Sequence, residues 1–340
     1  MRSDNLQVHS MSWFSYGYEI RGRRQEGHLK VAFVGNENEI ARVFGHGRRK
    51  AIEQRADVLE GVVNPDDPRM HAVEAIFSTW GMPLLTEKQL ESMPKLRAVF
   101  YAAGAVGYFS APLLARNIHI SSAWRANAVP VAEFTLAQVI LSLKGYSSNL
   151  RDPSRQQTPP APGIFGETVA LLGAGATGAK LIELLRPFRI EVIVFDPFMT
   201  ADRAESLGVS KVSIEQAFSD ALVVSNHLLD VPETVGLVHY ELLSSLRRGA
   251  TVINTGRGRT FRTTDLVQIL QERPDVTALL DVTDPEPLPS DHPLRELPNA
   301  VVSTHIAGSI GDEVLRMADS AIEEFDRFLG GETMHHLVFG

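Results

Sequence analysis

The chain has 340 residues, a formal net charge of −8 and no cysteine. Its 44% hydrophobic and 22% charged residues are typical of a globular protein, and its length allows two domains. The acidic balance argues against a nucleic-acid-binding protein, and the lack of cysteine excludes disulfides and thiolate metal sites. We expect no apolar stretch near the ~18 residues of a membrane span, and hence a cytoplasmic protein with no membrane partner and no metal.

Residues 1–27 show no clear period and are predicted to be an N-terminal extension. Two short basic clusters, at residues 21–24 and 47–50, are interpreted as solvated faces rather than phosphate-binding patches, because one short charge run carries little information. After the extension, short apolar runs alternate with amphipathic segments, a pattern typical of parallel βαβ units. The first strands are predicted at residues 29–35, 75–79, 96–101 and 119–121.

The middle of the chain carries a long apolar helix, predicted over residues 131–145, with Pro130 in the position that a first helical turn tolerates. Residues 151–163 are rich in proline and polar side chains and are predicted to be an exposed connection. A second βα series follows and is closed by a helix over residues 312–328. Its six strands, the number that a doubly wound dinucleotide fold uses, are predicted at residues 169–172, 192–195, 222–225, 251–254, 278–281 and 301–304.

A glycine pattern of the form G-x-G-x-x-G, Gly173, Gly175 and Gly178, directly follows the first strand of this second series. In a dinucleotide site the first glycine allows the sharp turn, the second lets the backbone approach the pyrophosphate, and the third allows close packing of helix and strand. Ala176 and Thr177 then begin a helix, whose N-terminal N–H groups attract phosphate. The alternative is an incidental tight turn, and the strand-turn-helix context favours the nucleotide site.

The next strand ends in Asp196, an acidic residue placed to accept hydrogen bonds from a ribose diol and to repel a 2′-phosphate. The sequence therefore predicts a dinucleotide site that prefers NAD to NADP. Two alternatives remain: Asp196 belongs to a surface turn before Pro197, or the whole pattern is the S-adenosylmethionine site of a methyltransferase.

Polar side chains follow the later strands of this series, at the edge where open α/β sheets bind ligands. A 2-keto acid that accepts a hydride needs a cation for its carboxylate and an acid for the developing alkoxide. Arg257 suits the first role, and His305, with Glu286 as its partner, suits the second. Each of these residues taken alone has a structural alternative, as a helix cap, a loop residue or a hydrogen-bonded core histidine. The residues at these strand ends are His227, Asn254, Thr255, Gly256, Arg257, Gly258, Asp281, Glu286 and His305.

Five segments resemble the D-isomer-specific 2-hydroxyacid dehydrogenase family, which includes phosphoglycerate, glycerate, formate and phosphite dehydrogenases. "LLGAGATG" is similar to its cofactor loop, "INTGRG" to its arginine motif, "LLDVTDPEPLP" to its acidic motif, "STHIAGS" to its histidine motif and "NAVPVAEFTLAQVI" to its interdomain helix. The resemblance covers residues 29 to 340. It implies an α/β fold of two Rossmann-like domains, in which a doubly wound NAD-binding sheet is inserted in a flavodoxin-like substrate domain.

By this resemblance the NAD-binding domain covers residues 127–308, and the substrate domain covers residues 28–126 and 309–340, with hinges near Asn127 and Gly308. The resemblance implies that Arg257 anchors the substrate, that His305 is the acid/base, and that Glu286 is the partner of His305. Asp281 would contact the nicotinamide amide, and a homodimer built around the cofactor domain is implied. The resemblance adds further cofactor contacts at His227, Thr255, Gly256, His305 and Gly308, and a substrate-carboxylate loop at Ala105, Val106 and Gly107, for which a simple turn of small residues is the alternative.

The chain departs from the family pattern at three positions near the cofactor. Leu229 stands where proline is common, Gly256 stands where alanine is usual, and Thr283 occupies a position that is often aromatic. Trp80 and Trp124 follow substrate-domain strands and are interpreted either as core residues or as walls of a cleft. The predicted function is an NAD-dependent dehydrogenase acting on a small D-2-hydroxy acid, of the glyoxylate, hydroxypyruvate or phosphoglycerate type. The alternatives are an NAD-sensing protein without turnover and a phosphite or formate dehydrogenase.

Overall fold

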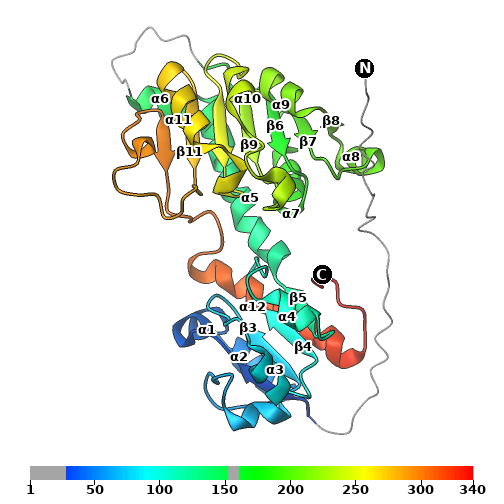
Figure 1. The fold of residues 1–340 in the computed structure, drawn as a ribbon. Helices are drawn as coiled ribbons and strands as arrows, with labels where there is room; N and C mark the ends of the chain where they lie inside the picture. The colour runs from blue at the N-terminus through cyan, green and yellow to red at the C-terminus, as the bar shows by residue number, and fades with distance from the viewer. Residues whose placement is uncertain (1–27, 152–160, 340) are drawn as a thin grey trace, which may run out of the picture. The chain divides into compact units, whose positions relative to one another are not determined.

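The computed structural model describes residues 28–151 and 161–339, which divide into two compact units (Figure 1). One unit takes in the described residues up to Ala123 and those from Ala318 on, and the other is Trp124–Met317. The units change at 123/124 and 317/318, whereas the predicted domain boundaries are 126/127 and 308/309 and stay a prediction. The predicted extension, the first basic cluster and most of the predicted connection at 151–163 lie outside the described residues.

The first unit is built on a five-stranded parallel sheet in the order β2-β1-β3-β4-β5, which is the flavodoxin order. All four strands predicted for this part of the chain are present, each within two residues of its predicted ends. The fifth, β2, has only two residues, too few to show a period in the sequence. The strands are β1 (Lys30–Phe33), β2 (Asp57–Val58), β3 (Ala75–Ser78), β4 (Ala98–Tyr101) and β5 (His119–Ser122).

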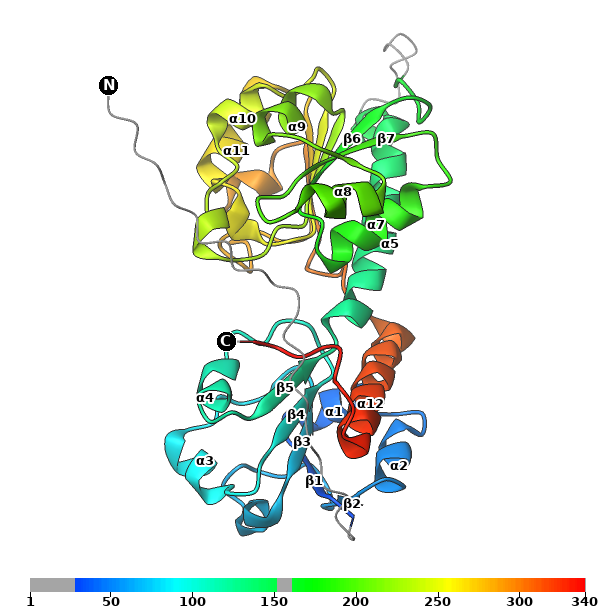
Figure 2. The same ribbon diagram turned by 90° about the vertical axis from the view of Figure 1, so that its right-hand side faces the viewer.

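Helices cover both faces of this sheet. Figure 2 shows α3 and α4 on one face and α2 and α12 on the other. Since side chains alternate along a strand, Val99 packs in the core under α3 and α4, whereas Phe100 faces the opposite way and stacks edge-on against Phe325 of α12. The helices are α1 (Glu37–Val43), α2 (Arg48–Glu53), η1 (Pro68–Ala72), α3 (Glu87–Ser92), α4 (Ser110–Leu114) and α12 (Val314–Gly330), with η denoting a 3-10 helix.

The second unit is built on a seven-stranded parallel sheet in the order β12-β11-β10-β9-β6-β7-β8. This is the doubly wound dinucleotide order with one strand added at the β12 edge. The six predicted strands are present, and the two-residue strand β8 was not predicted. The strands are β6 (Thr168–Leu172), β7 (Glu191–Phe195), β8 (Ser210–Lys211), β9 (Val223–Asn226), β10 (Thr251–Asn254), β11 (Thr277–Leu280) and β12 (Ala300–Val302). The predicted fold class is confirmed.

Two hydrophobic cores lie on the two faces of this sheet. Ala170 and Leu172 of β6 belong to the core under α9, α10 and α11, and Val169 and Leu171 belong to the core under α5, α7 and α8. The helices are α5 (Trp124–Leu143), α6 (Tyr146–Arg151), α7 (Ala176–Leu185), α8 (Ala201–Leu207), α9 (Ile214–Asp220), η2 (Pro232–Thr234), α10 (Tyr240–Ser244), η3 (Gly258–Thr260), α11 (Thr263–Glu272), η4 (Pro293–Arg295) and η5 (Gly311–Glu313).

Helix α5 differs from its prediction in two ways. It begins at Trp124, so Pro130 lies inside the helix rather than in its first turn, and buried Ala128, Ala132 and Val139 keep the chain helical on both sides of the proline. Its 20 residues, with a mean hydropathy of 1.4, also reach the length and composition of a membrane span. The expectation of no such stretch was therefore wrong, although a core helix passes the same test, and α5 packs on α7, β9 and β10.

Candidate active site

The glycine loop between β6 and α7 has the geometry of a phosphate cradle. Gly173 has φ +96°, and a Cβ atom there would lie 2.9 Å from the carbonyl oxygen of His227. A Cβ atom at Gly178 would overlap the carbonyl oxygen of Gly173, whereas Gly175 is exposed and faces open space. Helix α7 begins at Ala176 without a side-chain cap, so its first N–H groups face that open space unpaired by a capping side chain. The loop therefore fits a pyrophosphate.

Asp196, directly after β7, is fixed beside this loop. Its Oδ2 accepts the N–H of Ala174 at 2.8 Å, and its Oδ1 accepts the N–H of Phe198 at 2.8 Å. Each carboxylate oxygen has a further lone pair, so a ribose diol still finds acceptors there. Thr177 is the second residue of α7, directly after the same loop.

His227 lies at the end of β9 and is buried. Burial lowers the pKa of His227 to about 4, so the ring is neutral at physiological pH. Its Nε2 lies 2.9 Å from Ser225 Oγ, and its Nδ1 lies 3.4 Å from Thr255 Oγ1, which in turn lies 3.0 Å from Thr135 Oγ1 of α5. The side chains of His227 and Thr255, both predicted cofactor contacts, are thus held by a polar chain that reaches α5.

Arg257 follows β10 in a loop that the side chain of Asn254 organises. Asn254 Oδ1 accepts the N–H of Gly256 at 3.1 Å, and Asn254 Nδ2 donates to the carbonyl of Arg257 at 3.0 Å. The half-buried guanidinium donates to the carbonyl of Gly256 at 2.8 Å and forms no ion pair within the described parts of the chain. A free guanidinium with fixed backbone suits the binding of an external carboxylate.

The Arg257 loop also touches the acidic motif. A Cβ atom at Gly258 would overlap the backbone of Thr283, so only glycine fits there. Thr283 Oγ1 donates to the carbonyl of Pro285 at 2.8 Å. The hydroxyl at this departure from the family pattern therefore orders the loop that carries Glu286.

His305 and Glu286 form a pair. His305 Nδ1 lies 2.6 Å from Glu286 Oε1, and the two side chains are 50% and 41% exposed, so the pair is open to a ligand. The carboxylate partner makes Nδ1 the N–H position. His305 Nε2 has no partner among the described residues and is left for a substrate.

Buried Asp281 holds the loop on which His305 stands. Its Oδ1 accepts Ser303 Oγ at 2.6 Å and the N–H of Ile306 at 2.9 Å, and its Oδ2 accepts the N–H of Ala307 at 2.9 Å. The N–H of His305 donates to the Asp281 carbonyl at 3.0 Å. The structure thus gives Asp281 a supporting contact that the sequence did not predict, and its predicted contact with the nicotinamide amide stays a prediction.

The two predicted hinge positions lie against each other. A Cβ atom at Gly308 would lie 3.4 Å from Asn127 Oδ1, which accepts the N–H of Ser309 at 3.0 Å. Leu229, where the family commonly has proline, is 67% exposed after β9. It adds apolar surface to the edge of the sheet that carries the glycine loop.

The predicted carboxylate loop, Ala105, Val106 and Gly107, follows β4 in the other unit. In the described part of the chain these three residues donate no backbone N–H to another group. Ser122 Oγ, placed by β5, donates to the carbonyls of Ala103 and Gly104 at 2.9 and 2.6 Å and so fixes the start of the loop. Free N–H groups on a fixed turn are suited to an anion.

In the second unit, the sequence-predicted residues therefore gather at one edge. Because all strands of the sheet are parallel, the residues that follow β6, β7, β9, β10 and β11 emerge at its carboxyl end. The described residues contain no cluster of three or more metal-ligating side chains. Asn226 and Asn254, the last residues of β9 and β10, also lie at this edge. No role was predicted for either, because an asparagine at a strand end resembles an ordinary turn residue.

A family model, "D-isomer specific 2-hydroxyacid dehydrogenase, NAD binding domain", matches residues 136–307, about half of the chain. The chain belongs to the D-isomer specific 2-hydroxyacid dehydrogenase family. The unit Trp124–Met317 contains this NAD-binding domain, so the predicted family and cofactor are confirmed.

Individual members of the D-isomer specific 2-hydroxyacid dehydrogenase family are distant relatives. A D-3-phosphoglycerate dehydrogenase of Bacillus subtilis is 26% identical over 279 residues, 81% of this chain and 53% of the relative. A glyoxylate reductase of Korarchaeum cryptofilum is 27% identical over 281 residues, 79% of this chain and 84% of the relative. This chain thus spans about half the length of several curated relatives. The crystal structure of a phosphoglycerate oxidoreductase from Rhizobium etli shares the fold, with a TM-score of 0.77, 23% identity and coverage of 92% and 98% of the two chains.

Proposed function

We propose that this protein is an NAD-dependent dehydrogenase that interconverts a 2-keto acid and its D-2-hydroxy acid. The observation that carries the proposal is the His305–Glu286 pair, 2.6 Å apart and open to a ligand, on the same sheet edge as the glycine loop and an unpaired Arg257. A nicotinamide bound there supplies or accepts the hydride. The protein's residues have the complementary tasks of holding the carboxylate and moving one proton.

Arg257 binds the substrate carboxylate and polarises the neighbouring carbonyl. Its guanidinium keeps its charge and offers parallel N–H donors that match a carboxylate. The backbone N–H groups of Ala105, Val106 and Gly107 bind the same class of anion from the substrate domain, for which we keep the predicted residues 28–126 and 309–340. Both elements recognise the acid function and leave the rest of the substrate undefined.

His305 donates its Nε2 proton to the alkoxide oxygen as the keto acid is reduced. Glu286, bound at Nδ1, orients the ring and stabilises the imidazolium from which that proton comes. In the reverse direction the same nitrogen accepts the hydroxyl proton. Asp196 favours NAD over NADP, because its carboxylate sits where a 2′-phosphate would bring like charge.

The test is a substrate screen with the purified protein. NADH oxidation is followed with glyoxylate, hydroxypyruvate, 3-phosphohydroxypyruvate, pyruvate and longer keto acids, and NAD reduction with formate and phosphite. We expect turnover with at least one keto acid. Tight NADH binding without turnover of any of these compounds would instead support an NAD-sensing protein, and turnover of formate or phosphite alone would support that dehydrogenase type.

We further propose a homodimer formed through α5 and α6. Leu141, Tyr146 and Leu150 of these helices are 42%, 49% and 62% exposed, an apolar surface beside the cofactor-binding sheet. Leu141→Glu is expected to convert a dimer to a monomer in sedimentation equilibrium. A wild-type protein that sediments as a monomer at all concentrations would refute this assembly. A cytoplasmic location stays a prediction of the sequence.

A further inference from the structure

Residues 226–228, which end β9 and begin the turn after it, lie between the cofactor loop and the Arg257 loop. On one side, a Cβ atom at Gly173 would lie 2.9 Å from the carbonyl oxygen of His227. On the other side, a Cβ atom at Gly256 would lie 2.9 Å from Asn226 Nδ2 and 3.1 Å from the Asn226 carbonyl oxygen. The same three residues therefore occupy the space that a side chain would need at both glycine positions.

Asn226 is fully buried, and its amide is fixed at both ends. Its Nδ2 donates to Asn254 Oδ1 at 3.0 Å, and its Oδ1 accepts the N–H of Leu228 at 3.2 Å. This pairing decides the orientation of the Asn254 amide, whose oxygen also accepts the N–H of Gly256 and whose nitrogen donates to the carbonyl of Arg257. A flipped Asn254 amide would oppose donor to donor at Asn226 and acceptor to acceptor at Arg257.

We propose that Asn226 is a positioning residue for substrate binding: it holds the Arg257 loop through Asn254, and its amide makes glycine obligatory at position 256. The proposal rests on the proposed function, in which Arg257 anchors the substrate carboxylate. It also accounts for the departure at Gly256, where the family usually has alanine, because a methyl group there would crowd the Asn226 amide nitrogen at 2.9 Å and the Asn226 carbonyl oxygen at 3.1 Å.

The first test is Asn226→Ala. We expect the KM for the best keto acid of the screen to rise about tenfold, the equivalent of one lost hydrogen bond at about 1.4 kcal/mol. The Kd of NADH, measured by its fluorescence, should stay within about twofold, because the glycine loop itself is unchanged. An unchanged KM, or an NADH Kd that rises as much as the KM, would overturn the proposal, since Asn226 would then not act through the Arg257 loop.

The second test is a double-mutant cycle with Gly256→Ala. In the wild-type background the added methyl group must push against the Asn226 amide, so we expect a higher KM and a lower unfolding midpoint. In the Asn226→Ala background the side-chain amide is gone and only the Asn226 carbonyl oxygen, 3.1 Å away, still faces the added methyl group, so adding Gly256→Ala should change either quantity less. Equal effects of Gly256→Ala in both backgrounds would refute the coupling between the two positions.

Different measurements test the proposed function and this inference, so the failure of one can be told from the failure of the other. A wild-type protein that reduces no keto acid refutes the proposed reaction alone. The unfolding midpoints of the same four proteins then decide the coupling without any turnover. Non-additive midpoints support the obligatory glycine, and additive midpoints overturn it.

Discussion

His305 has a backbone φ of +60°, a conformation that few residues other than glycine adopt, and it is held there by the Asp281 side chain and carbonyl. Such backbone strain persists where the surroundings enforce it, often at ligand sites. In this protein the Asp281 contacts hold the His305 backbone in a conformation from which the ring reaches Glu286. The pair is thus built by the fold rather than by chance proximity of two exposed side chains.

His305→Gln is expected to remove the proton donor while keeping a polar side chain of similar length. We expect kcat for keto-acid reduction to fall by about 10²- to 10⁴-fold, the usual contribution of general acid catalysis. NADH affinity should not change, because the glycine loop and Asp196 remain. Steady-state kinetics and NADH fluorescence titration measure the two effects, and retention of wild-type kcat would remove His305 from the mechanism.

His227 gives the folded protein a defined response to acid. Its pKa is about 4 in the folded state and near 6.5 when unfolded, so the unfolded chain binds the extra proton as the pH falls through this window. We expect this residue to lower the free energy of unfolding by about 3 kcal/mol as the pH falls from 6.5 to 4, at about 1.4 kcal/mol per pH unit. Well above pH 6.5 both states are neutral, and no such contribution remains.

Other groups titrate in the same range, so the measurement is a difference between wild type and His227→Gln. Glutamine keeps a side-chain nitrogen that can reach Ser225 and does not titrate. Urea unfolding at pH 7 and at pH 4.5 should show a smaller loss of stability for the variant. Parallel pH dependences for the two proteins would contradict the assignment.

The sequence predicted most residues at the cofactor edge because each follows an apolar run that ends at the same side of a parallel sheet. It did not predict the links between them. The role of Asn226 depends on its distance to Asn254, at the end of β10, and to Gly256 in the loop that follows. The support that Asp281 gives to His305 depends on the loop after β12 returning to the Asp281 side chain. Such contacts join residues far apart in sequence and leave no local pattern.

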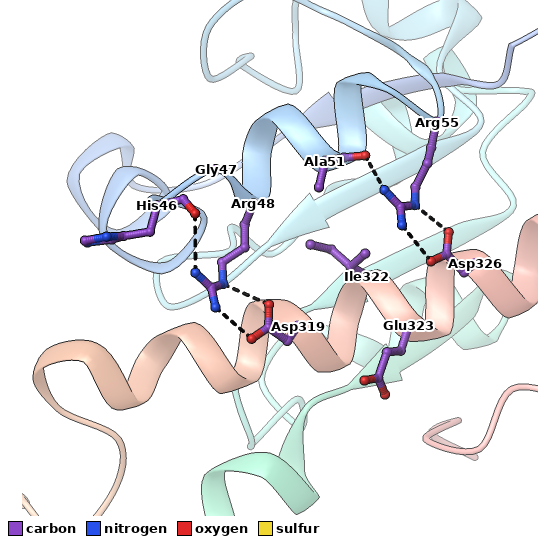
Figure 3. Close-up of a pocket in the computed structure, with 9 residues that line it drawn as sticks. All are labelled: His46, Gly47, Arg48, Ala51, Arg55, Asp319, Ile322, Glu323 and Asp326. Atoms are coloured by element: carbon purple, nitrogen blue, oxygen red, sulfur yellow. Dashed lines mark hydrogen bonds and ion pairs between the residues drawn. The ribbon is translucent and has the colours of Figure 1, made fainter.

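At the scale of the element, two ion pairs join α2 and Arg55, which follows it, to α12 across a shallow groove (Figure 3). Arg48 binds both carboxylate oxygens of Asp319 at 2.9 and 2.8 Å, and Arg55 binds both of Asp326 at 2.6 and 3.1 Å. Ile322 is buried between the two pairs. Both arginines of the groove are neutralised by these carboxylates, so we assign the groove to stability rather than to ligand binding.

The Arg55–Asp326 pair is expected to contribute about 0.5 to 1 kcal/mol, the upper range for partly exposed bidentate pairs. A double-mutant cycle of Arg55→Ala and Asp326→Ala, followed by urea unfolding, measures this coupling. Since salt screens exposed charges, the coupling should shrink at 1 M NaCl. The Arg49–Glu53 pair within α2 is a matched control that does not join two helices. If the coupling energy of Arg55 and Asp326 is no larger than that of Arg49 and Glu53, the Arg55–Asp326 pair does not link Arg55 to α12 in the way proposed.

Element boundaries were predictable where polar residues or glycine bound an apolar run, as at β6 and β10. The two-residue strands β2 and β8 were not, because they are defined only by pairing with β1 and β7. The start of α5 was missed for a different reason. Proline is common in a first helical turn, and only the structure, in which Ala128 and Ala132 are buried on either side of Pro130, shows that the helix continues through it.

At the scale of the whole molecule, the insertion of one α/β unit into another follows from where α12 packs. Its charge pattern predicts an amphipathic helix, but nothing local indicates that Phe325 packs on Phe77 and Phe100 at the other end of the chain. The strand orders are likewise long-range properties. The domain insertion and the strand orders were predicted from the resemblance to a known family. The periodicity of the sequence alone predicted only that strands and helices alternate.

The second unit contains a complete sheet, two hydrophobic cores and the glycine loop, all within Trp124–Met317. A chain of residues 124–317 is therefore expected to fold and to bind NADH with a Kd within about tenfold of the full protein. It should reduce no keto acid, because the loop Ala105–Gly107 belongs to the other unit. The same fragment carrying Gly178→Ala is the control and should lose NADH binding, since the methyl group overlaps the Gly173 carbonyl. A fragment that folds but binds no NADH, by fluorescence titration and circular dichroism, would show that the cofactor site needs residues outside this unit.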